Sequence, residues 1–312
     1  MKILFTGGGG AGNAGIFHLW NDKYELHFAD ADPEAISPLF PQRCCHKIPF
    51  AEDISFLPEI ASLCSDLNID ILVPGVDEEL SQMGLLENRV AGLKILVPEP
   101  DFVDVMLDKL KTAQKLEEKG VGGPKTLSAA ESGKISFPCF VKPRRGRGSR
   151  GAMVLNSEQD LIAYIRLSEI SAQDIVVQDL LVGQEYTVMM AADASANLHA
   201  VVPVQVDVKR GVTIRAKTNF EPSVIAMCRK IHRAIPARGC YNIQLMFTPA
   251  GEVMPFEINP RISTTFCLGV ASGINPVAIF LHDLEPPSDI LPFANGVTLK
   301  RTWQNHFSTE NG

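Results

Sequence analysis

The chain has 312 residues, of which 46% are hydrophobic and 21% charged, and its formal net charge is −7. This length and composition predict a folded chain with a substantial core, organised as two domains or as one large domain with subdomains. They exclude collagen-like, low-complexity and disordered classes. The excess of acidic residues argues against bulk nucleic-acid binding, because the chain has no overall positive field that would attract a polyanion.

The cysteines and the apolar segments indicate a cytoplasmic protein. Seven cysteines are scattered along the chain without a Cys-x-x-Cys pair, which predicts reduced core thiols rather than disulfides or a zinc site. The apolar run at residues 3–5 is too short for the core of a signal peptide, so we expect no export. No apolar stretch has the length that spans a bilayer, and we expect no membrane partner.

The first hundred residues alternate between short apolar runs and helical patterns. The runs lie at 3–5, 25–28, 70–73 and 94–97. Alternation of this kind predicts a parallel sheet covered by helices.

A different pattern begins near Pro98. One amphipathic helix is predicted from Asp101 or Asp104 to about Lys119. The later elements are a hairpin of strands 139–143 and 152–155, a helix at 158–167, a strand at 175–181, strand pattern from 185 to about 208, a helix at 222–236, and a hairpin of strands 241–247 and 252–259. The tail at 289–312 gives no clear pattern.

A glycine run, GGGGAGNAG at 7–15, follows the first predicted strand and fits G-x-G-x-x-G twice. Asp30 and Asp32 stand near the end of the second strand, where a dinucleotide-binding fold places a ribose-binding acid. The run therefore suggests NAD or FAD binding. An ordinary strand-to-helix turn, binding another anion or none, explains the glycines equally well.

The loop KPRRGRGSRG, from Lys142 to Gly151, combines five cations with three glycines between two predicted strands. Free backbone N–H groups beside guanidinium groups are suited to binding a polyphosphate. A solvated hairpin tip or a small nucleic-acid patch are the alternatives. We favour phosphate, because the glycines serve no purpose in solubility.

The hairpin near the carboxyl terminus carries the sharpest pattern, FEINPR at 256–261. Glu257 and Asn259 are two apart on a strand, so their side chains leave the same face, and Gln244 projects from the neighbouring strand. Carboxylate and amide oxygens suit Mg²⁺ that completes its shell with phosphate and water. Arg261 follows as a donor to a transferring phosphate. The alternative is a polar strand end before a proline turn.

Two weaker features accompany these. Lys109 lies on the predicted amphipathic helix, where an ordinary solvated lysine is the simpler interpretation. The segment 178–188 joins an apolar strand to Glu185 through Gly183, and such a segment can pair with an adenine edge while the acid binds ribose. A strand with an exposed acid explains it as well.

In this order, DK at 108–109, the VKP-plus-glycine loop, QDLLVGQEYTV at 178–188, NIQ at 242–244 and FEINPR resemble the ATP-grasp superfamily, nearest to its carbamoyl-phosphate-synthase-like branch. The resemblance extends to about residue 285. It implies an α/β and α+β architecture: a Rossmann-like domain at 1–104, then an ATP-grasp fold of two α+β subdomains that clasp ATP. The first subdomain, 105–186, holds the phosphate loop, and the second, 187–312, holds the metal site.

The resemblance also implies roles for the matching positions. The residues expected to bind ATP are Lys109, Lys142, Arg147, Gly148, Ser149, Gln178, Asp179, Leu180, Leu181, Glu185 and Gln244. Those expected to hold Mg²⁺, with Mn²⁺ as a substitute, are Gln244, Glu257 and Asn259. Arg261 and Lys142 are expected to act on the transferring phosphate.

The chain departs from its relatives at several of these positions. The loop is richer in arginine, which favours an anionic substrate. Asp179 stands where glutamate is common, and Gln244 replaces an acid found in many relatives. A single unit without tandem halves argues against synthesis of carbamoyl phosphate itself.

The resemblance therefore predicts a ligase that activates a small carboxylate as an acyl phosphate for attack by an amine. A homodimer is compatible with the sequence. An NAD(P)-dependent oxidoreductase that uses the glycine run is the first alternative function, and a non-catalytic ATP-binding regulatory protein is the second.

Two further pairs are candidates for the substrates. Asp77 and Glu78 could hold an amino group at a strand end, and Arg215 or Lys217 could hold a carboxylate. Capping acids and surface cations are the favoured interpretation of both pairs.

Overall fold

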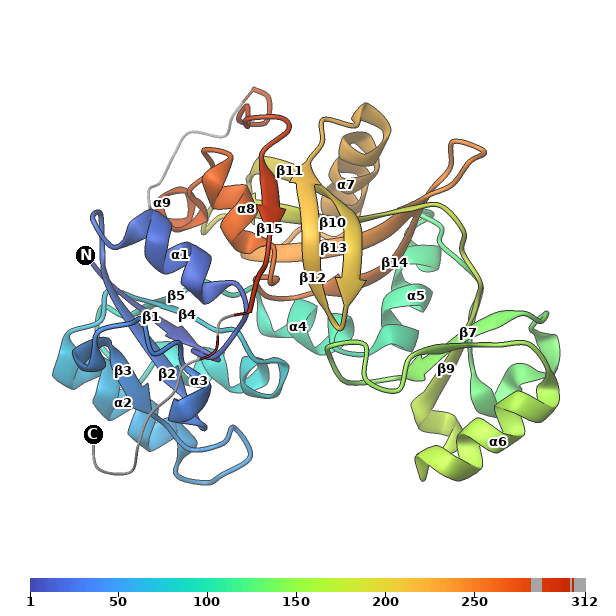
Figure 1. Ribbon diagram of the computed structural model, residues 1–312, viewed down its shortest axis with the longest axis horizontal. Coiled ribbons are helices and arrows are strands. Elements are labelled where there is room, and N and C mark those ends of the chain that lie inside the picture. Colours follow the sequence, from blue (N-terminus) through green and yellow to red (C-terminus); the bar gives the residue numbers. More distant parts are fainter. Residues whose placement is uncertain (282–287, 304, 306–312) are drawn as a thin grey trace.

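The chain folds into three β-sheets, and helices pack against each of them (Figure 1). The computed structural model describes residues 1–281, 288–303 and 305. In Figure 1 the amino-terminal sheet lies on the left, the sheet that follows it lies at the lower right, and the largest sheet lies above and between them.

The amino-terminal sheet is parallel throughout, with the strand order β3-β2-β1-β4-β5. Its strands are β1 (Lys2–Thr6), β2 (Glu25–Asp30), β3 (Cys45–Lys47), β4 (Ile71–Val73) and β5 (Lys94–Ile95). Its helices are α1 (Asn13–Trp20), α2 (Phe56–Leu67), α3 (Met83–Glu87) and α4 (Pro100–Met106). The parallel sheet predicted from the alternating runs is confirmed.

Strand β1 is buried on both faces, which explains its unbroken apolar sequence. Ile3 and Phe5 point to one side and pack in the cluster that contains Trp20 of α1. Leu4 points to the other side and packs with Phe56 of α2. Successive side chains of a strand leave opposite faces, so this strand stabilises two cores at once.

The second sheet is antiparallel, in the order β6-β9-β7-β8, and is covered by α6 (Glu158–Ser168). Its strands are β6 (Thr126–Ser128), β7 (Cys139–Pro143), β8 (Met153–Leu155) and β9 (Ile175–Asp179). Leu161 and Tyr164 of α6 pack against Val141 and Val177. The predicted hairpin of two strands around the basic loop is confirmed as β7 and β8.

The third sheet has the order β14-β13-β10-β11-β12-β15 and is antiparallel throughout. Its strands are β10 (Gln184–Ala192), β11 (Leu198–Arg210), β12 (Val212–Thr218), β13 (Gly239–Phe247), β14 (Val253–Asn259) and β15 (Thr298–Lys300). Helices α5 (Lys109–Glu118), α7 (Pro222–Ala234), α8 (Phe266–Ala271) and α9 (Pro276–Leu281) pack around it. The third sheet begins at Gln184, the first residue of β10. The predicted division into domains at 104/105 and 186/187 stays a proposal.

The two faces of the third sheet have different surroundings, as strand β10 shows. Val188 and Met190 pack beneath α4, α5 and α7, whereas Met189 packs on the opposite side with the amino-terminal core. Glu185 and Thr187 share the face of Met189 by strand alternation but lie beyond that core, where they line a cleft. One face of the sheet therefore stabilises the domain contact and also supplies polar groups to a site.

The prediction of one helix from 101 or 104 to 119 is wrong, because the chain forms two helices, α4 and α5. Asp108 lies between them in an extended conformation, and its carboxylate accepts hydrogen bonds from the backbone N–H groups of Leu110 and Lys111. Aspartate is a strong N-cap, so it starts a new helix instead of continuing the old one. This break places Lys109 at the first position of α5.

The tail contributes one element that the sequence did not predict, because β15 is only three residues long and pairs with the edge strand β12. Arg301, just after β15, donates hydrogen bonds to the carbonyl oxygens of Ala11 and Thr264. It ties the glycine-rich loop to the segment before α8. Residues 304 and 306–312 of the tail lie outside the described residues.

The seven cysteines are all free, as predicted, and all but Cys45 are buried. Among the described residues, no helix has both the length and the apolarity needed to cross a bilayer.

Candidate active site

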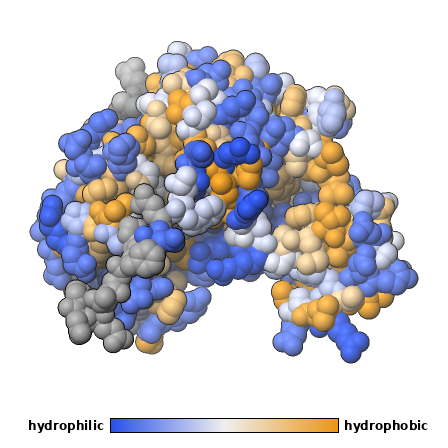
Figure 2. All heavy atoms as spheres, viewed as in Figure 1, coloured by the Kyte–Doolittle hydropathy of each residue, from blue (hydrophilic) through white to orange (hydrophobic). Residues whose placement is uncertain are grey.

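A cleft of about 790 Å³ opens where the three sheets meet. Its walls come from the glycine-rich loop after β1, the basic loop between β7 and β8, the link from β9 to β10, and the polar faces of β10, β13 and β14. Figure 2 shows the surface hollowed between the amino-terminal and second sheets, with hydrophilic residues beside the hollow. Every residue predicted to bind ATP or metal, and Arg261, lines this cleft, although their roles stay predictions.

Strands β13 and β14 bring the predicted metal ligands onto one face. Gln244 lies directly opposite Glu257, and Asn242 lies opposite Asn259. The Asn259 amide donates to Asn242 Oδ1 at 3.2 Å, and the Asn242 amide donates to the Arg261 carbonyl at 2.9 Å. Asn242 is a site residue that sequence reasoning passed over, although its position two residues before Gln244 places it on the same face.

Lys142 and Glu257 form an ion pair that joins the second sheet to the third. The Lys142 Nζ lies 3.2 Å from Glu257 Oε2 and 5.3 Å from the centre of the Phe256 ring. Only 5% of Lys142 is exposed. Burial lowers the pKa of Lys142, and the Glu257 charge opposes this shift. Burial also opposes ionisation of Glu257, but the charges of Lys142 and Lys109 lower its pKa below the ordinary value.

The donor set on β13 and β14 fits a magnesium ion. It offers one carboxylate and amide oxygens, which are hard ligands of the type that Mg²⁺ prefers. Within the described ranges, no group of three His, Cys, Asp or Glu residues could hold a metal. Gln244, Glu257 and Asn259 would supply few ligands, which suits an ion that takes most of its shell from phosphate and water.

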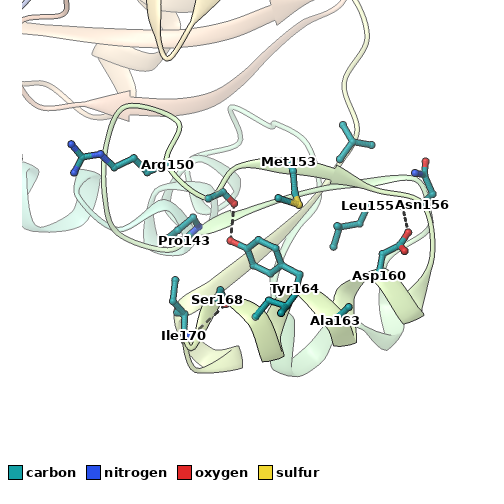
Figure 3. Close-up of a pocket in the computed structure, with 13 residues that line it drawn as sticks. Pro143, Arg150, Met153, Leu155, Asn156, Asp160, Ala163, Tyr164, Ser168 and Ile170 are labelled. Carbon is teal, nitrogen blue, oxygen red and sulfur yellow. Dashed lines mark hydrogen bonds between the residues drawn. The ribbon is translucent and has the colours of Figure 1, made fainter.

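The basic loop is anchored at both ends. At its start, Lys109 Nζ donates to the Gly146 carbonyl at 2.7 Å, and Arg144 Nε donates to the Asp108 carboxylate at 2.8 Å. At its end, the Tyr164 hydroxyl of α6 donates to the Gly151 carbonyl at 2.7 Å (Figure 3).

Within the loop, Gly146, Gly148 and Ser149 have positive φ angles of 119°, 70° and 56°. A Cβ atom on either glycine would meet nothing within 4 Å. These two glycines are therefore required by backbone conformation rather than by close packing.

The link between β9 and β10 forms a further wall. A Cβ atom on Gly183 would lie 2.2 Å from the Phe247 carbonyl oxygen, so only glycine lets the link approach β13 this closely. Gln178 is buried, and its amide donates to the Thr126 hydroxyl at 2.7 Å. Apolar side chains that the sequence did not single out complete this end of the cleft: Phe140, Val154, Met246 and Phe256.

Glu185 is paired with a lysine that sequence reasoning did not select. Lys209, near the end of β11, donates to Glu185 Oε1 at 2.6 Å, and both residues line the cleft. A single lysine in a strand does not indicate a binding site by its sequence alone. Its partner Glu185 lies 24 residues away in the sequence, so only the folded chain shows the pair.

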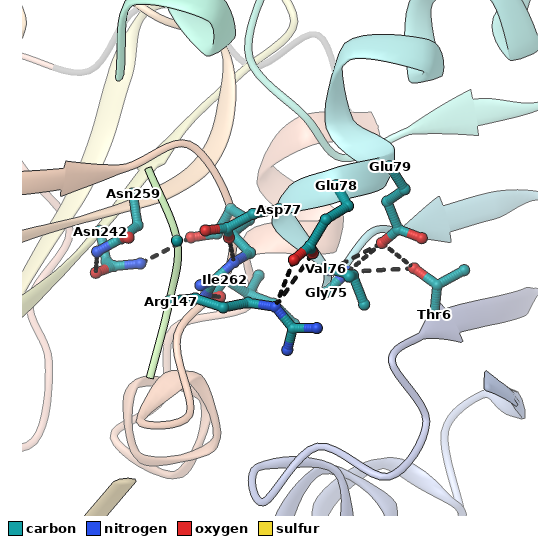
Figure 4. A network of polar contacts seen from close by, with 12 residues as sticks. Thr6, Gly75, Val76, Asp77, Glu78, Glu79, Arg147, Asn242, Asn259 and Ile262 are labelled. Atoms are coloured by element: carbon teal, nitrogen blue, oxygen red, sulfur yellow. Dashed lines mark hydrogen bonds and ion pairs between the residues drawn. The ribbon is translucent and has the colours of Figure 1, made fainter. Parts of the chain in front are cut away.

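Asp77 and Glu78 are each paired with an arginine (Figure 4). Arg261 donates to Asp77, and Arg147 of the basic loop lies 3.1 Å from Glu78. These contacts account for both acids without an amino group from a substrate.

The glycine-rich loop satisfies its own hydrogen bonds. The Gly9 N–H donates to the Asp30 carboxylate at 2.9 Å, and the Gly10 N–H donates to the Gly7 carbonyl at 2.8 Å. The other oxygen of Asp30 accepts from the backbone of Asp32. A Cβ atom on Gly9 would lie 2.6 Å from that of Ala35. These contacts favour an ordinary strand-to-helix turn, because the acid proposed for a ribose is used within the loop.

Arg215 and Lys217 lie on β12, and neither is among the described residues that line the cleft. The favoured interpretation of this pair as surface cations agrees with their position, since Arg215 is exposed and Lys217 half-buried.

A family model described as the ATP-grasp domain matches residues 106–265, just over half of the chain. The chain belongs to the ATP-grasp family. The match covers the basic loop, the link and the hairpin that carries Glu257 and Asn259.

Curated relatives share low identity with this ATP-grasp protein. The carbamoyl phosphate synthase large chain of Thermoanaerobacter sp. (strain X514) is 26% identical over 216 residues, covering 63% of this chain and 20% of the relative. A D-alanine–D-alanine ligase of Corynebacterium aurimucosum is 23% identical over 225 residues, covering 69% of this chain and 59% of the relative. The chain thus spans about a fifth of the synthase and less than two thirds of the ligase.

The L-amino acid ligase from Bacillus licheniformis superposes with a TM-score of 0.67 at 15% identity, over 90% of this chain and 73% of the other. The likeness extends over the amino-terminal parallel sheet and both antiparallel sheets. The predicted ATP-grasp architecture with a preceding parallel-sheet domain is confirmed.

Glu79 fixes the segment at 75–76, which lines the cleft (Figure 4). Its Oε1 accepts the Thr6 hydroxyl at 2.5 Å and the backbone N–H groups of Gly75 and Val76 at 2.9 Å each. The side chain is 2% exposed, and burial raises the pKa of Glu79 to about 7, although these hydrogen bonds oppose the shift.

We predict that Glu79 makes stability fall as pH rises through neutrality. Its pKa is higher in the folded than in the unfolded chain, so its stabilising effect is complete below the unfolded value and is lost as pH rises through about 7. The free energy of unfolding should fall by about 1 kcal/mol from this group between roughly pH 6 and pH 8. Urea unfolding of Glu79→Gln should lack this component, with exposed Glu52→Gln as control. Parallel pH curves for wild type and Glu79→Gln would contradict the prediction.

We predict that Asp108 stabilises the chain in two separable ways. Asp108→Ala loses both the cap of α5 and the pair with Arg144, and should lower the free energy of unfolding by about 2–4 kcal/mol. Asp108→Asn keeps a capping oxygen and should lose roughly half as much. Urea unfolding measures both variants. Equal losses would show that the cap contributes nothing.

Proposed function

We propose that this protein is an ATP- and Mg²⁺-dependent ligase that joins a carboxylate to an amine. A carboxylate oxygen attacks the γ-phosphorus, the bond from that phosphorus to the β–γ bridging oxygen breaks, and ADP leaves. The amine nitrogen then attacks the carbonyl carbon of the acyl phosphate, the bond to the phosphate oxygen breaks, and phosphate and a proton leave. The observation that carries the proposal is the 3.2 Å approach of Lys142 to Glu257 inside one cleft.

The cleft is suited to ATP along its length. Asp179, Leu180 and Leu181 offer backbone groups to an adenine edge, and the apolar side chains at this end would sandwich the flat ring. Glu185 would accept hydrogen bonds from ribose hydroxyls. Lys109 and Lys142 would then lie beside the phosphates, beneath the basic loop.

Magnesium would be held by Glu257, Asn259 and Gln244. When bound, the ion neutralises charge on the β- and γ-phosphate oxygens during transfer. Lys142 holds the Glu257 carboxylate in position, so the two strands present their oxygens together.

The chain's own groups would position the reactants and exclude water. Arg261 is fixed by Asp77 and by its hydrogen bond to the Ile262 carbonyl, and it would donate to the transferring phosphate. Closure of the basic loop would keep water from the acyl phosphate. This chemistry requires no protein nucleophile.

The substrate end would lie near Gly9, Gly10 and Ala11 and the segment 263–265, which complete the cleft. The arginines of the basic loop favour an anionic carboxylate there. The names of two relatives, a D-alanine–D-alanine ligase and an L-amino acid ligase, support an amine as the acceptor.

The two alternative functions have less support. A dinucleotide oxidoreductase needs a ribose-binding acid, and the Asp30 carboxylate is engaged by the Gly9 and Asp32 backbone. A regulatory ATP-binding protein would use the same cleft without turnover, and the following screen separates it from a ligase.

We predict that incubation with ATP, Mg²⁺, pooled carboxylates and hydroxylamine yields ADP and a hydroxamate, because hydroxylamine captures the acyl phosphate. Chromatography for ADP and mass spectrometry for the hydroxamate identify the activated acid. Reactions without the acid pool are the control. Binding of MgATP by calorimetry with no product from any pool would establish the regulatory role instead.

We predict that Glu257→Gln lowers the rate of ADP formation by about 100-fold, because it removes the one carboxylate of the metal site. The fold should persist with reduced stability, since the amide keeps the size of the side chain but leaves the buried Lys142 without its charged partner. Exposed Glu252→Gln, at the turn of the same hairpin, is the matched control. Circular dichroism and ADP release measure the two effects, and normal turnover in Glu257→Gln would refute the metal role.

A further inference from the structure

We infer that Lys209 is a third phosphate-binding lysine, and that nucleotide binding exchanges its partner Glu185 for a phosphate group. The inference rests on the proposed function only in requiring that ATP occupies the cleft. It assigns a specificity role, because a lysine placed this way distinguishes nucleotides by the phosphates they carry.

The first support is the position of Lys209. Its Nζ lies 2.6 Å from Glu185 Oε1, and the two side chains are 27% and 22% exposed. It lines the same cleft as Lys109 and Lys142. The three lysines come from β11, from the start of α5 and from β7, so they approach the cleft from separate elements.

The second support is electrostatic. The charge of Lys209 is among the causes that lower the pKa of Lys142, after burial, and it also helps to lower the pKa of Glu257. Lys209 therefore acts on the Lys142–Glu257 pair as well as on Glu185. Lys209 thus contacts one acid of the cleft, Glu185, and lies near enough to a second, Glu257, to lower its pKa.

The third support is the contact between the β11–β12 turn and the basic loop. A Cβ atom on Gly211, two residues beyond Lys209, would lie 3.8 Å from the Gly148 carbonyl oxygen. The turn and the loop thus lie close together, and both line the cleft. Lys209 lies in β11, which leads into the turn, and Lys142 lies in β7, which leads into the basic loop.

Exchange of partners is favoured by the chemistry of the pair. A partly exposed lysine–carboxylate contact is weak, because solvent screens it and two long side chains must be ordered. A phosphate offers more negative charge and more acceptor oxygens than one carboxylate. Once Lys209 turns to phosphate, the Glu185 oxygen that it held becomes available to a ribose hydroxyl.

Calorimetric titration of adenosine, AMP, ADP and ATP, the last two with Mg²⁺, tests the inference. Lys209→Gln should weaken ADP and ATP by about tenfold or more, because it removes a charged hydrogen bond to phosphate. It should not weaken adenosine binding, because adenosine carries no phosphate for Lys209 to bind. Lys209→Arg should restore most of the loss in ADP and ATP affinity. Exposed Arg210→Gln is the matched control for net charge.

The alternative is that Lys209 only orients Glu185 for the ribose. Lys209→Gln would then weaken adenosine and ATP by the same factor, as Glu185→Gln should, and that result would overturn the inference. Unchanged affinity for every ligand in Lys209→Gln would overturn it as well. Absence of ATP binding in the wild-type chain would instead reject the proposed nucleotide site, so the two failures are distinguishable.

Discussion

The Lys142–Glu257 ion pair is the interaction on which the arrangement of the cleft depends. Its two charges come from different sheets and lie 115 positions apart in the chain. Lys142 is almost fully buried, and a buried charge is tolerated only with a partner. Neither group can leave the other without compensation, which keeps the second sheet registered against β14. A bound phosphate and its metal would offer each group that compensation.

The same pairing of opposite charges recurs in and beside the cleft. Lys209 contacts Glu185, Arg147 contacts Glu78, and Arg261 contacts Asp77. These contacts neutralise much of the charge that would otherwise repel within the site. If the cleft binds a polyanion, as proposed, the ligand would compete with these acids for the cations. The selectivity of the cleft would then depend on how many of these internal contacts a ligand can replace.

Much of this could be predicted from the sequence, because periodicity and short motifs are local. The parallel sheet followed from alternating runs, and the positions of Glu257 and Asn259 followed from the two-residue repeat of a strand. The break at Asp108 could not be seen by periodicity, since apolar spacing continued through it while the cap decided the geometry. Lys209 could not be selected, because its partner Glu185 lies 24 positions away and only folding brings the two together. Asn242 was passed over although its spacing of two residues from Gln244 places both on one face of the strand.

The glycine run shows why a motif alone does not determine a ligand. G-x-G-x-x-G describes a chain that turns tightly from strand to helix, and this requirement exists whether or not a phosphate is bound. The ligand is decided by the groups that the turn leaves free. Here the Gly9 and Gly10 N–H groups and the Asp30 carboxylate bond one another or the loop itself, so they are not offered to a dinucleotide. Yet the loop still lines the cleft, and its small residues leave room there for a substrate. Under the proposed function, the glycines would shape the space for the carboxylate, which is a steric role rather than a phosphate-binding one.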